Sequence, residues 1–180
     1  MALERETLLD IWDNLTDVLR FGKWWQRLIV IGIPLSVVFA IFWFRPLPPE
    51  INDKLVYLDE SSNNLYADGA ASILDEYYEY VSLEGEETTW MRSTWKEKLK
   101  DRFADYQRRG WSVRQETTSE SFYWKGISSL VQTVIIHRQQ YDRGQLFKET
   151  RYRVIYTWSK TDHGWYVTRA QVLPRVKSDE

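Results

Sequence analysis

The sequence contains no cysteine among its 180 residues. This absence excludes disulfide bonds, catalytic thiolates, iron–sulfur clusters and zinc sites built from cysteine. Histidine is almost as scarce, with two residues, His137 and His163, and neither has a second histidine at metal-ligand spacing. The sequence also has no glycine-rich phosphate loop and no Ser-His-Asp arrangement. We therefore predict no catalytic residue, no metal site and no cofactor for this chain.

Net charge is equally small, at −2, so no overall field draws nucleic acid or an acidic substrate to the chain. Aromatic and arginine residues alternate in 151–158, which could stack on single-stranded nucleic acid. The same alternation is more typical of a solvated outer sheet face, and we predict no nucleic-acid partner. Aromatic residues themselves are abundant, at 16% of the chain, and such rings serve cores, interfaces and membrane belts.

One long apolar stretch stands out, residues 24–44, which read WWQRLIVIGIPLSVVFAIFWF. No charged side chain occurs in it after Arg27. About 20 residues of helix, roughly 30 Å, match the thickness of a bilayer core. Tryptophans at both ends favour the headgroup level. We predict a single transmembrane helix over 24–44, and the following RPLPPE is a poor cleavage site, so we expect an uncleaved signal anchor.

The charges beside this span indicate its orientation. Arg20, Lys23 and Arg27 lie at its start, whereas Arg45 and Lys54 follow it. The positive-inside rule then favours a cytoplasmic N-terminus and an external C-terminal domain. We expect a single-pass protein of the bacterial inner membrane with a periplasmic domain, and the lipid bilayer as one partner.

The N-terminal segment, residues 1–23, shows the pattern of an amphipathic helix over 4–21. Its apolar positions recur at three- and four-residue steps: Leu8, Ile11, Trp12, Leu15, Val18 and Leu19. The opposite face carries Asp10, Asp13 and Asp17, whereas a helix lying on an anionic membrane normally has a basic face. Two interpretations stay open, an interfacial helix hinged at Gly22 and a helix docked on a protein partner.

Residues 45–54 contain three prolines and predict a semi-rigid spacer. The remaining residues, 55–180, suffice for one compact domain. Within it, 56–83 and 90–109 have helical periodicity, with Gly85 and Gly110 marking the ends of the two helices.

From residue 111 onward the apolar period changes to two. Four segments alternate in this way, 111–124, 127–141, 147–158 and 165–173. Short turns at 142–144 and 162–164 each contain a glycine for a left-handed position, which predicts an antiparallel meander. The expected fold is α+β, with the N-terminal amphipathic helix and one transmembrane helix followed by two helices packed on a curved, cone-like, four-stranded antiparallel sheet.

Charge is distributed unevenly along the two predicted helices. Residues 55–89 hold nine acidic residues and no Lys or Arg, whereas residues 90–114 hold eight basic and three acidic residues. Either the two segments lie side by side, or the acidic segment of one copy meets the basic segment of the next. A second copy of the chain is therefore one candidate partner.

The order of helix, helix and four long antiparallel strands resembles the cone-shaped nuclear-transport-factor-2-like (NTF2-like) fold. Residues 73–87, ILDEYYEYVSLEGEE, are similar to its opening helix and turn, and residues 151–173 are similar to its closing hairpin. With one anchor and a proline spacer, the chain resembles the bitopic inner-membrane scaffold proteins of type IV secretion systems. The resemblance implies an assembly platform.

Enzymes with this kind of fold use a polar pair inside the cone, for example an acid with a tyrosine or a histidine. Asp75, Tyr77, His137 and Tyr141 are available for such a pair, although ordinary core and rim positions explain them better. We expect a non-catalytic scaffold or accessory subunit of a multiprotein membrane complex, either a secretion machine or a photosynthetic or respiratory complex. The alternative is a tethered small-molecule binder or enzyme. A polar-lined cavity would favour that alternative, and a cone filled with Trp and Tyr would favour the scaffold.

Overall fold

The computed structural model describes Thr16, Arg20, Lys23, Trp24, Gln26 and residues 31–37 and 44–173, in two compact units, Met1–Pro46 and Leu47–Glu180. In the first unit residues 31–37, in the middle of the predicted span, are helical. The rest of that span up to residue 43, and most of the predicted amphipathic helix over 4–21, lie outside the described residues. Within the described part of the chain, no helix combines the length and apolar character needed to cross a bilayer.

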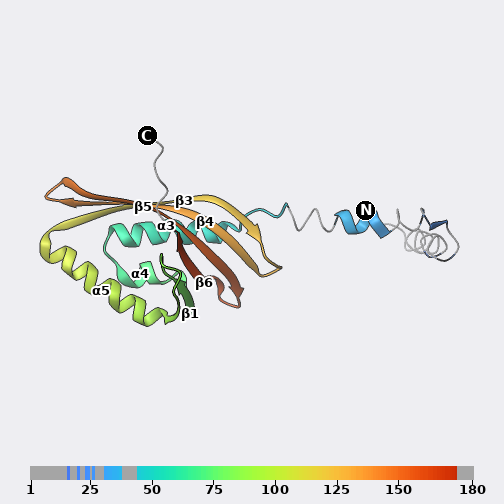
Figure 1. The fold of residues 1–180 in the computed structure, drawn as a ribbon, viewed down its shortest axis with the longest axis horizontal. Helices are drawn as coiled ribbons and strands as arrows, with labels where there is room; N and C mark the ends of the chain where they lie inside the picture. The colour runs from blue at the N-terminus through green and yellow to red at the C-terminus, as the bar shows by residue number, and fades with distance from the viewer. Residues whose placement is uncertain are drawn as a thin grey trace, which may run out of the picture. The chain divides into compact units, whose positions relative to one another are not determined.

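The second unit is a six-stranded curved sheet with its helices on one side (Figure 1). The helices are α3 (Pro49–Asn63), α4 (Ala67–Ala71) and α5 (Arg92–Arg109). The strands are β1 (Leu74–Val81), β2 (Glu87–Met91), β3 (Trp111–Trp124), β4 (Ser129–Asp142), β5 (Gln145–Thr161) and β6 (Gly164–Leu173). They lie in the order β2-β1-β6-β5-β4-β3, and the predicted α+β class is confirmed.

The four strands predicted from the alternating pattern correspond to β3, β4, β5 and β6, and each is antiparallel to its neighbour. The turn between β4 and β5 consists of Arg143 and Gly144, both with positive φ (49° and 82°). Two successive left-handed residues match the twist of the flanking strands, which explains why this short turn closes a hairpin.

The predicted helix over 56–83 is wrong in its second half, and the sheet has six strands rather than four. Asn64 ends α3, Leu65 adopts a left-handed φ of 55°, and after the short α4 the chain continues as β1. Apolar residues in 74–81 fit both a helical and an alternating period. Tyr-rich sequence favours a strand, and pairing with β6 decides the matter: β1 runs parallel to β6 and antiparallel to β2. Gly85 (φ 85°) therefore lies in a hairpin loop rather than after a helix.

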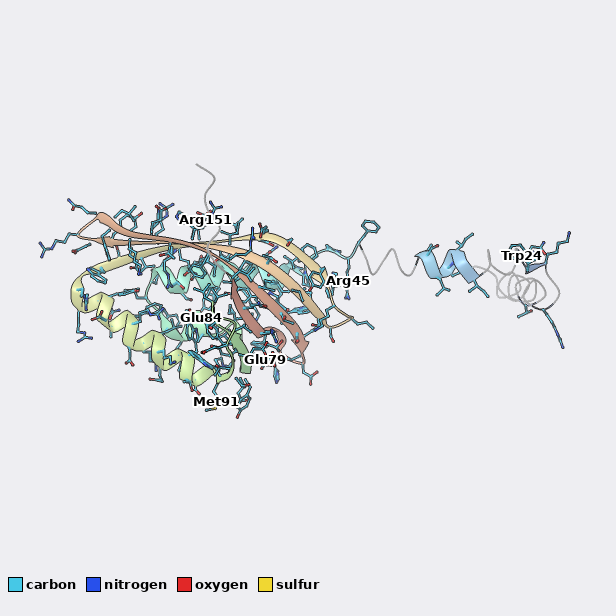
Figure 2. The ribbon with its side chains drawn as sticks, in the orientation of Figure 1. Trp24, Arg45, Glu79, Glu84, Met91 and Arg151 are labelled. Carbon is cyan, nitrogen blue, oxygen red and sulfur yellow. The ribbon has the colours of Figure 1, made fainter. Side chains whose placement is uncertain are left out.

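The boundaries of the other two segments also differ from prediction. Helix α3 begins at Pro49, so the predicted spacer over 45–54 is largely helical, because proline is well tolerated in the first helical turn. The predicted second helix is confirmed as α5, and Gly110 caps it with a left-handed φ of 69°. Met91 lies within the predicted helix over 90–109 but belongs to β2 instead, and its side chain is 47% exposed. Figure 2 labels it at the surface of the domain.

The core lies between α3 and the face of the sheet turned toward it, which we call the inner face. On α3, Ile51, Leu55 and Leu58 recur at helical spacing and are buried. On the sheet, Val134 and Trp158 are fully buried in the same cluster. The opposite, outer face carries the intervening residues of each strand, and Figure 2 shows Arg151 projecting from it.

Glycine is favoured at the first residue of β6 by its backbone conformation and by a close neighbouring side chain. Gly164 has a φ of 114°, and a Cβ at this position would collide with Oε1 of Glu50, which accepts a hydrogen bond from the Trp165 amide at 3.1 Å. We expect Gly164→Ala to lower the free energy of unfolding by about 2 kcal/mol, because backbone strain and displacement of Glu50 add.

Gly144→Ala is the matched control for this prediction. Gly144 also has a positive φ (82°), but nothing lies within 4 Å of its added Cβ, so we expect a loss of only about 1 kcal/mol. Urea unfolding of both variants measures the difference. Equal losses of stability would show that the Glu50 side chain moves away from the added Cβ without lowering the free energy of unfolding.

Candidate functional site

The inner face of the sheet is the place where an NTF2-like cone would hold a ligand, and here large side chains fill it. Trp158 is fully buried, and its indole N–H donates to Oε1 of Gln132 at 3.0 Å. The Gln132 amide in turn donates to Oγ of Ser119 at 3.0 Å, so both ends of this fully buried amide are bonded within the protein. The polar side-chain atoms of Trp158 and Gln132 are therefore paired within the protein, as buried polar groups usually are.

Two tyrosines complete this filling. Tyr156 packs edge-on against Trp158, with ring centroids 6.0 Å apart, and Tyr78 of β1 is 3% exposed. Burial is the main cause that raises the pKa of both phenols well above the ordinary value of tyrosine. Both side chains therefore stay neutral at physiological pH, and neither is suited to act as a base there.

A carboxylate at the end of α3 is bound to the free edge of β3. Asp59 accepts hydrogen bonds from Gln115 Nε2 at 2.9 Å, from the Thr117 amide at 2.6 Å and from the Thr117 hydroxyl at 2.6 Å. One turn later Asn63 accepts from the Gln115 amide at 2.5 Å and donates to the Gln115 carbonyl at 3.2 Å. We call these four residues the α3–β3 clamp. It satisfies backbone groups that an edge strand otherwise leaves unpaired.

The structure does not bring the four sequence candidates together inside the cone. His137 lies on the outer face and contacts Glu149 at 2.5 Å. This contact is the main reason that the pKa of Glu149 lies below its ordinary value. Tyr77 is 58% exposed, the Tyr141 hydroxyl donates to Gln139, and Asp75 accepts from the backbone next to it.

His163 lies in the β5–β6 turn, as expected, with its amide bonded to the hydroxyl of Thr161. Within the described residues, no group of three or more His, Cys, Asp or Glu is placed to hold a metal ion.

Sequence reasoning missed both the clamp and the Gln132–Trp158 pair. For Gln132 a signal existed, because an amide stands in the mainly apolar run of 130–136 (LVQTVII) and a buried amide requires partners. No such signal marked Asp59 or Asn63. Helical periodicity places them on a helix, but only the packing of α3 beside the edge of the sheet shows what they bind.

A shallow groove lies between α4 and α5, outside the filled core. Its volume is about 280 Å³, and its lining residues are Leu65, Tyr66, Ala67, Asp68, Lys100, Phe103, Ala104 and Gln107. At its rim Asp68 lies 3.6 Å from Lys96 and 4.0 Å from Lys100. The acidic and basic segments predicted from the sequence therefore meet here within one chain.

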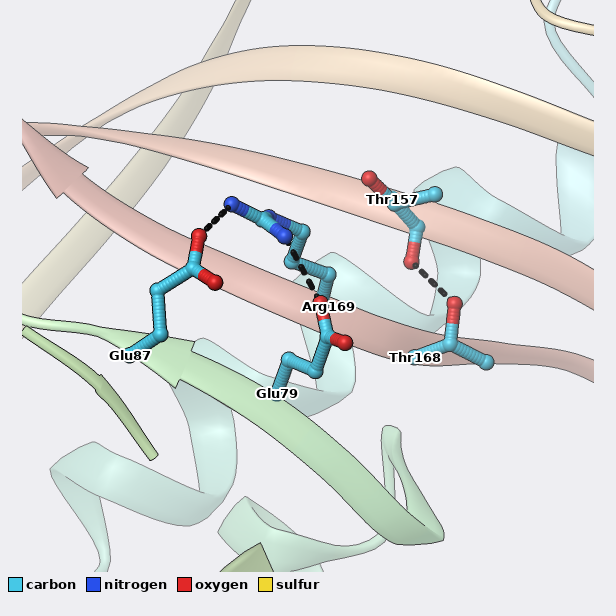
Figure 3. A network of polar contacts seen from close by, with 5 residues as sticks. All are labelled: Glu79, Glu87, Thr157, Thr168 and Arg169. Carbon is cyan, nitrogen blue, oxygen red and sulfur yellow. Dashed lines mark hydrogen bonds and ion pairs between the residues drawn. The ribbon is translucent and has the colours of Figure 1, made fainter. Parts of the chain in front are cut away.

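The outer face carries a second set of ion pairs, where β6 meets β1 and β2. The Arg169 guanidinium contacts Glu79 at 2.7 Å and Glu87 at 2.6 Å (Figure 3). Nearby, the Thr168 hydroxyl donates to the Thr157 carbonyl at 3.3 Å. Arg169 thus joins three strands across the parallel pair of the sheet. Exposed pairs of this kind contribute little energy each, so they align the strands more than they stabilise them.

Exposed aromatic and apolar side chains occur at both ends of the sheet, in addition to others on α3 and β1. At the tip of the β4–β5 hairpin, Leu146 and Phe147 are 48% and 44% exposed, and the Phe147 ring lies 4.6 Å from that of Trp111. At the other end, Tyr123 and Ile127 are 61% and 71% exposed. Such residues are enriched where proteins bind proteins or membranes.

Solved structures with a similar fold share little sequence with this chain. A domain of unknown function with a cystatin-like fold from Nostoc punctiforme is 14% identical, with a TM-score of 0.57 over 72% of this chain and 77% of that one. An NTF2-like protein of unknown function from Shewanella oneidensis is 14% identical, with a TM-score of 0.54 over 70% and 98%. A protein provisionally named scytalone dehydratase, from Novosphingobium aromaticivorans, is 12% identical, with a TM-score of 0.56 over 72% and 85%.

No protein-family model and no curated protein matches the sequence. At these identities the likeness shows the fold alone, and one fold hosts many functions. The expected NTF2-like fold is confirmed.

Proposed function

We propose that this chain is a non-catalytic scaffold or accessory subunit of a multiprotein membrane complex. Residues 24–44 anchor it in the bacterial inner membrane, with the N-terminus in the cytoplasm and the folded domain in the periplasm. The observation that carries the non-catalytic role is the filled inner face, where Trp158 is fully buried and Gln132 bonds to both Trp158 and Ser119. In this proposal the domain acts through its surface, because buried side chains occupy this part of the inner face.

Three parts of the chain supply contacts in this proposal. They are the amphipathic segment over 4–21, the apolar span and the exposed aromatic residues at the two ends of the sheet. An anchor joined to such a domain is also the arrangement of the type IV secretion scaffolds that the sequence resembles. The partners are then the other subunits of a secretion machine, or of a photosynthetic or respiratory complex, and further copies of the chain.

A tethered binder or enzyme is the second candidate, and one observation favours it. Asp59 on α3 and Arg138 on β4 act in opposite directions on the pKa of Tyr156, so an acid and a cation lie near this phenol of the inner face. Against it, the Asp59 carboxylate already accepts three hydrogen bonds from β3. A carboxylate held in this way is a poor general base, because proton transfer would have to break those bonds.

The predicted N-terminal helix provides the test of the scaffold role. We expect Trp12→Ala with Leu15→Ala to reduce the recovery of partner subunits several-fold, because full burial of each large apolar side chain is worth roughly 1.5–3 kcal/mol. Insertion into the membrane should not change, because residues 24–44 are intact. The measurement is co-purification of the full-length chain and its partners in mild detergent.

Asp10→Ala with Asp17→Ala, on the opposite face of the same predicted helix, is the matched control. It removes two side chains but leaves the apolar stripe, so partner recovery should stay near that of the wild type. Unchanged recovery with the Trp12 and Leu15 variant would mean that the helix rests on lipid instead.

A further inference from the structure

One end of the domain lies where the chain enters it, and we call this the proximal end. It comprises the first turn of α3, the β3–β4 loop (residues 125–128) and the β5–β6 turn (Figure 1). Glu50 in that first turn bonds to the Trp165 amide at 3.1 Å, and the Trp165 ring lies 5.7 Å from Trp124 at the end of β3. The Lys160 amide donates to the Ser128 carbonyl at 2.8 Å. These contacts hold both hairpin ends beside the start of α3.

The proximal end presents apolar and aromatic side chains to solvent. Tyr123, Ile127 and Phe122 are 61%, 71% and 38% exposed, within six residues of one another in sequence. Two exposed cations, Lys125 and Lys160, stand among them. Amphipathic rings and apolar tips flanked by lysine suit the boundary between lipid headgroups and acyl chains. In water the same exposed surface is unfavourable.

The length of the spacer limits how far this end can lie from a membrane. The apolar span ends at Phe44, and Leu47 already packs against the core of the domain, with α3 starting at Pro49. Three steps along an extended chain cover about 10 Å. A spacer over all of 45–54, as predicted from the sequence, would allow about three times that reach. An anchored domain is therefore held with its proximal end close to the headgroups.

We propose that the proximal end docks on the lipid surface of the membrane in which residues 24–44 are anchored, with Tyr123, Ile127 and Phe122 entering the headgroup layer. This inference rests on the anchor of the proposed function. Docking fixes the orientation of the domain, so that the β4–β5 hairpin, with Leu146 and Phe147, points away from the bilayer toward partner subunits.

The absence of cysteine makes a direct test possible, because any introduced cysteine is labelled alone. We would place a fluorophore on the full-length chain at Gly126→Cys in the proximal loop, at Gln145→Cys at the opposite end, or at Val37→Cys in the span. Gly126 has nothing within 4 Å of an added Cβ. Each variant is reconstituted in vesicles of phosphatidylcholine and phosphatidylglycerol that contain nitroxide-labelled lipid.

The expected result is several-fold stronger quenching at position 126 by headgroup nitroxide than at position 145, and strong quenching at position 37 by acyl-chain nitroxide. Adding Tyr123→Asp with Ile127→Asp should abolish the difference between 126 and 145. Leu146→Asp with Phe147→Asp, at two exposed positions of the far end, should leave it unchanged.

The two proposals fail in different ways. Quenching at 37 with equal, weak quenching at 126 and 145 would overturn docking and leave the anchor standing. Quenching at 126 without quenching at 37 would support docking and overturn the transmembrane anchor. Weak quenching at all three positions would overturn both. A difference at 126 that survives the Tyr123 and Ile127 substitutions would overturn the role of these side chains.

Discussion

Replacing Trp158 with alanine is expected to lower the free energy of unfolding of the domain by about 4 kcal/mol. Trp158 is a fully buried side chain on the inner face, and large-to-small substitutions of buried aromatic residues cost about 3–5 kcal/mol through lost transfer energy and the cavity left behind. The substitution also leaves Oε1 of Gln132 without its donor. Urea unfolding of residues 47–180, followed by circular dichroism, measures the loss.

A double-mutant cycle separates the hydrogen bond from the packing. Trp158→Phe removes the indole N–H, Gln132→Leu removes its acceptor, and each single change leaves one buried polar group unpaired. Because replacing both partners by apolar groups removes the unpaired atom, the double variant should lose about 1–2 kcal/mol less than the two single losses together. Strict additivity would mean that water already satisfies the pair in the folded protein.

Asp59→Ala is expected to lower the free energy of unfolding by about 3 kcal/mol. The carboxylate accepts three hydrogen bonds from β3, and bonds to charged groups are worth about 1.5–3 kcal/mol each before discounting for the partial exposure of Asp59. Without Asp59 the Thr117 amide at the sheet edge loses its acceptor. The same urea unfolding experiment measures the effect, and exchange of the Thr117 amide hydrogen should become faster.

Glu60→Ala is the matched control, since Glu60 is the next residue of α3, has the same charge and is exposed. We expect it to change the free energy of unfolding by no more than about 0.5 kcal/mol. A comparable loss for both variants would show that helix charge, rather than the α3–β3 clamp, is responsible.

The Trp158–Gln132 pair and Asp59 are relevant to function because both are engaged in contacts within the fold. Trp158 and Gln132 occupy the inner face, and Asp59 secures α3 over the edge of β3, so the core of the fold is used for stability. In the proposed scaffold role, we expect binding to involve the exposed residues at the ends of the sheet. We expect variants there, such as Tyr123→Asp, to alter membrane contact with little change in unfolding, because Tyr123 is largely exposed.

Much of the secondary structure of the domain could be predicted from local sequence patterns. Period-two alternation from residue 111 onward placed β3 to β6 within a few residues, because each strand has one face in the core and one in solvent. Gly110 and Gly144 marked a helix cap and a hairpin turn, since both positions require a left-handed backbone. The order of elements indicated an α+β, NTF2-like fold, and the absence of cysteine excluded whole classes of chemistry.

Tertiary contacts decided the rest. The periodicity of residues 74–81 fits a helix and a strand equally well. The parallel pairing with β6 is what makes this segment a strand, β1. Gln115 lies 56 residues after Asp59 and 52 after Asn63, and nothing local shows that α3 lies along the edge of β3. Whether the cone is hollow or filled depends on which side chains of the six strands and three helices meet in the core. The periodicity of apolar residues along the chain indicates which side chains are buried. Which residues they contact depends on the packing of segments that are distant in sequence.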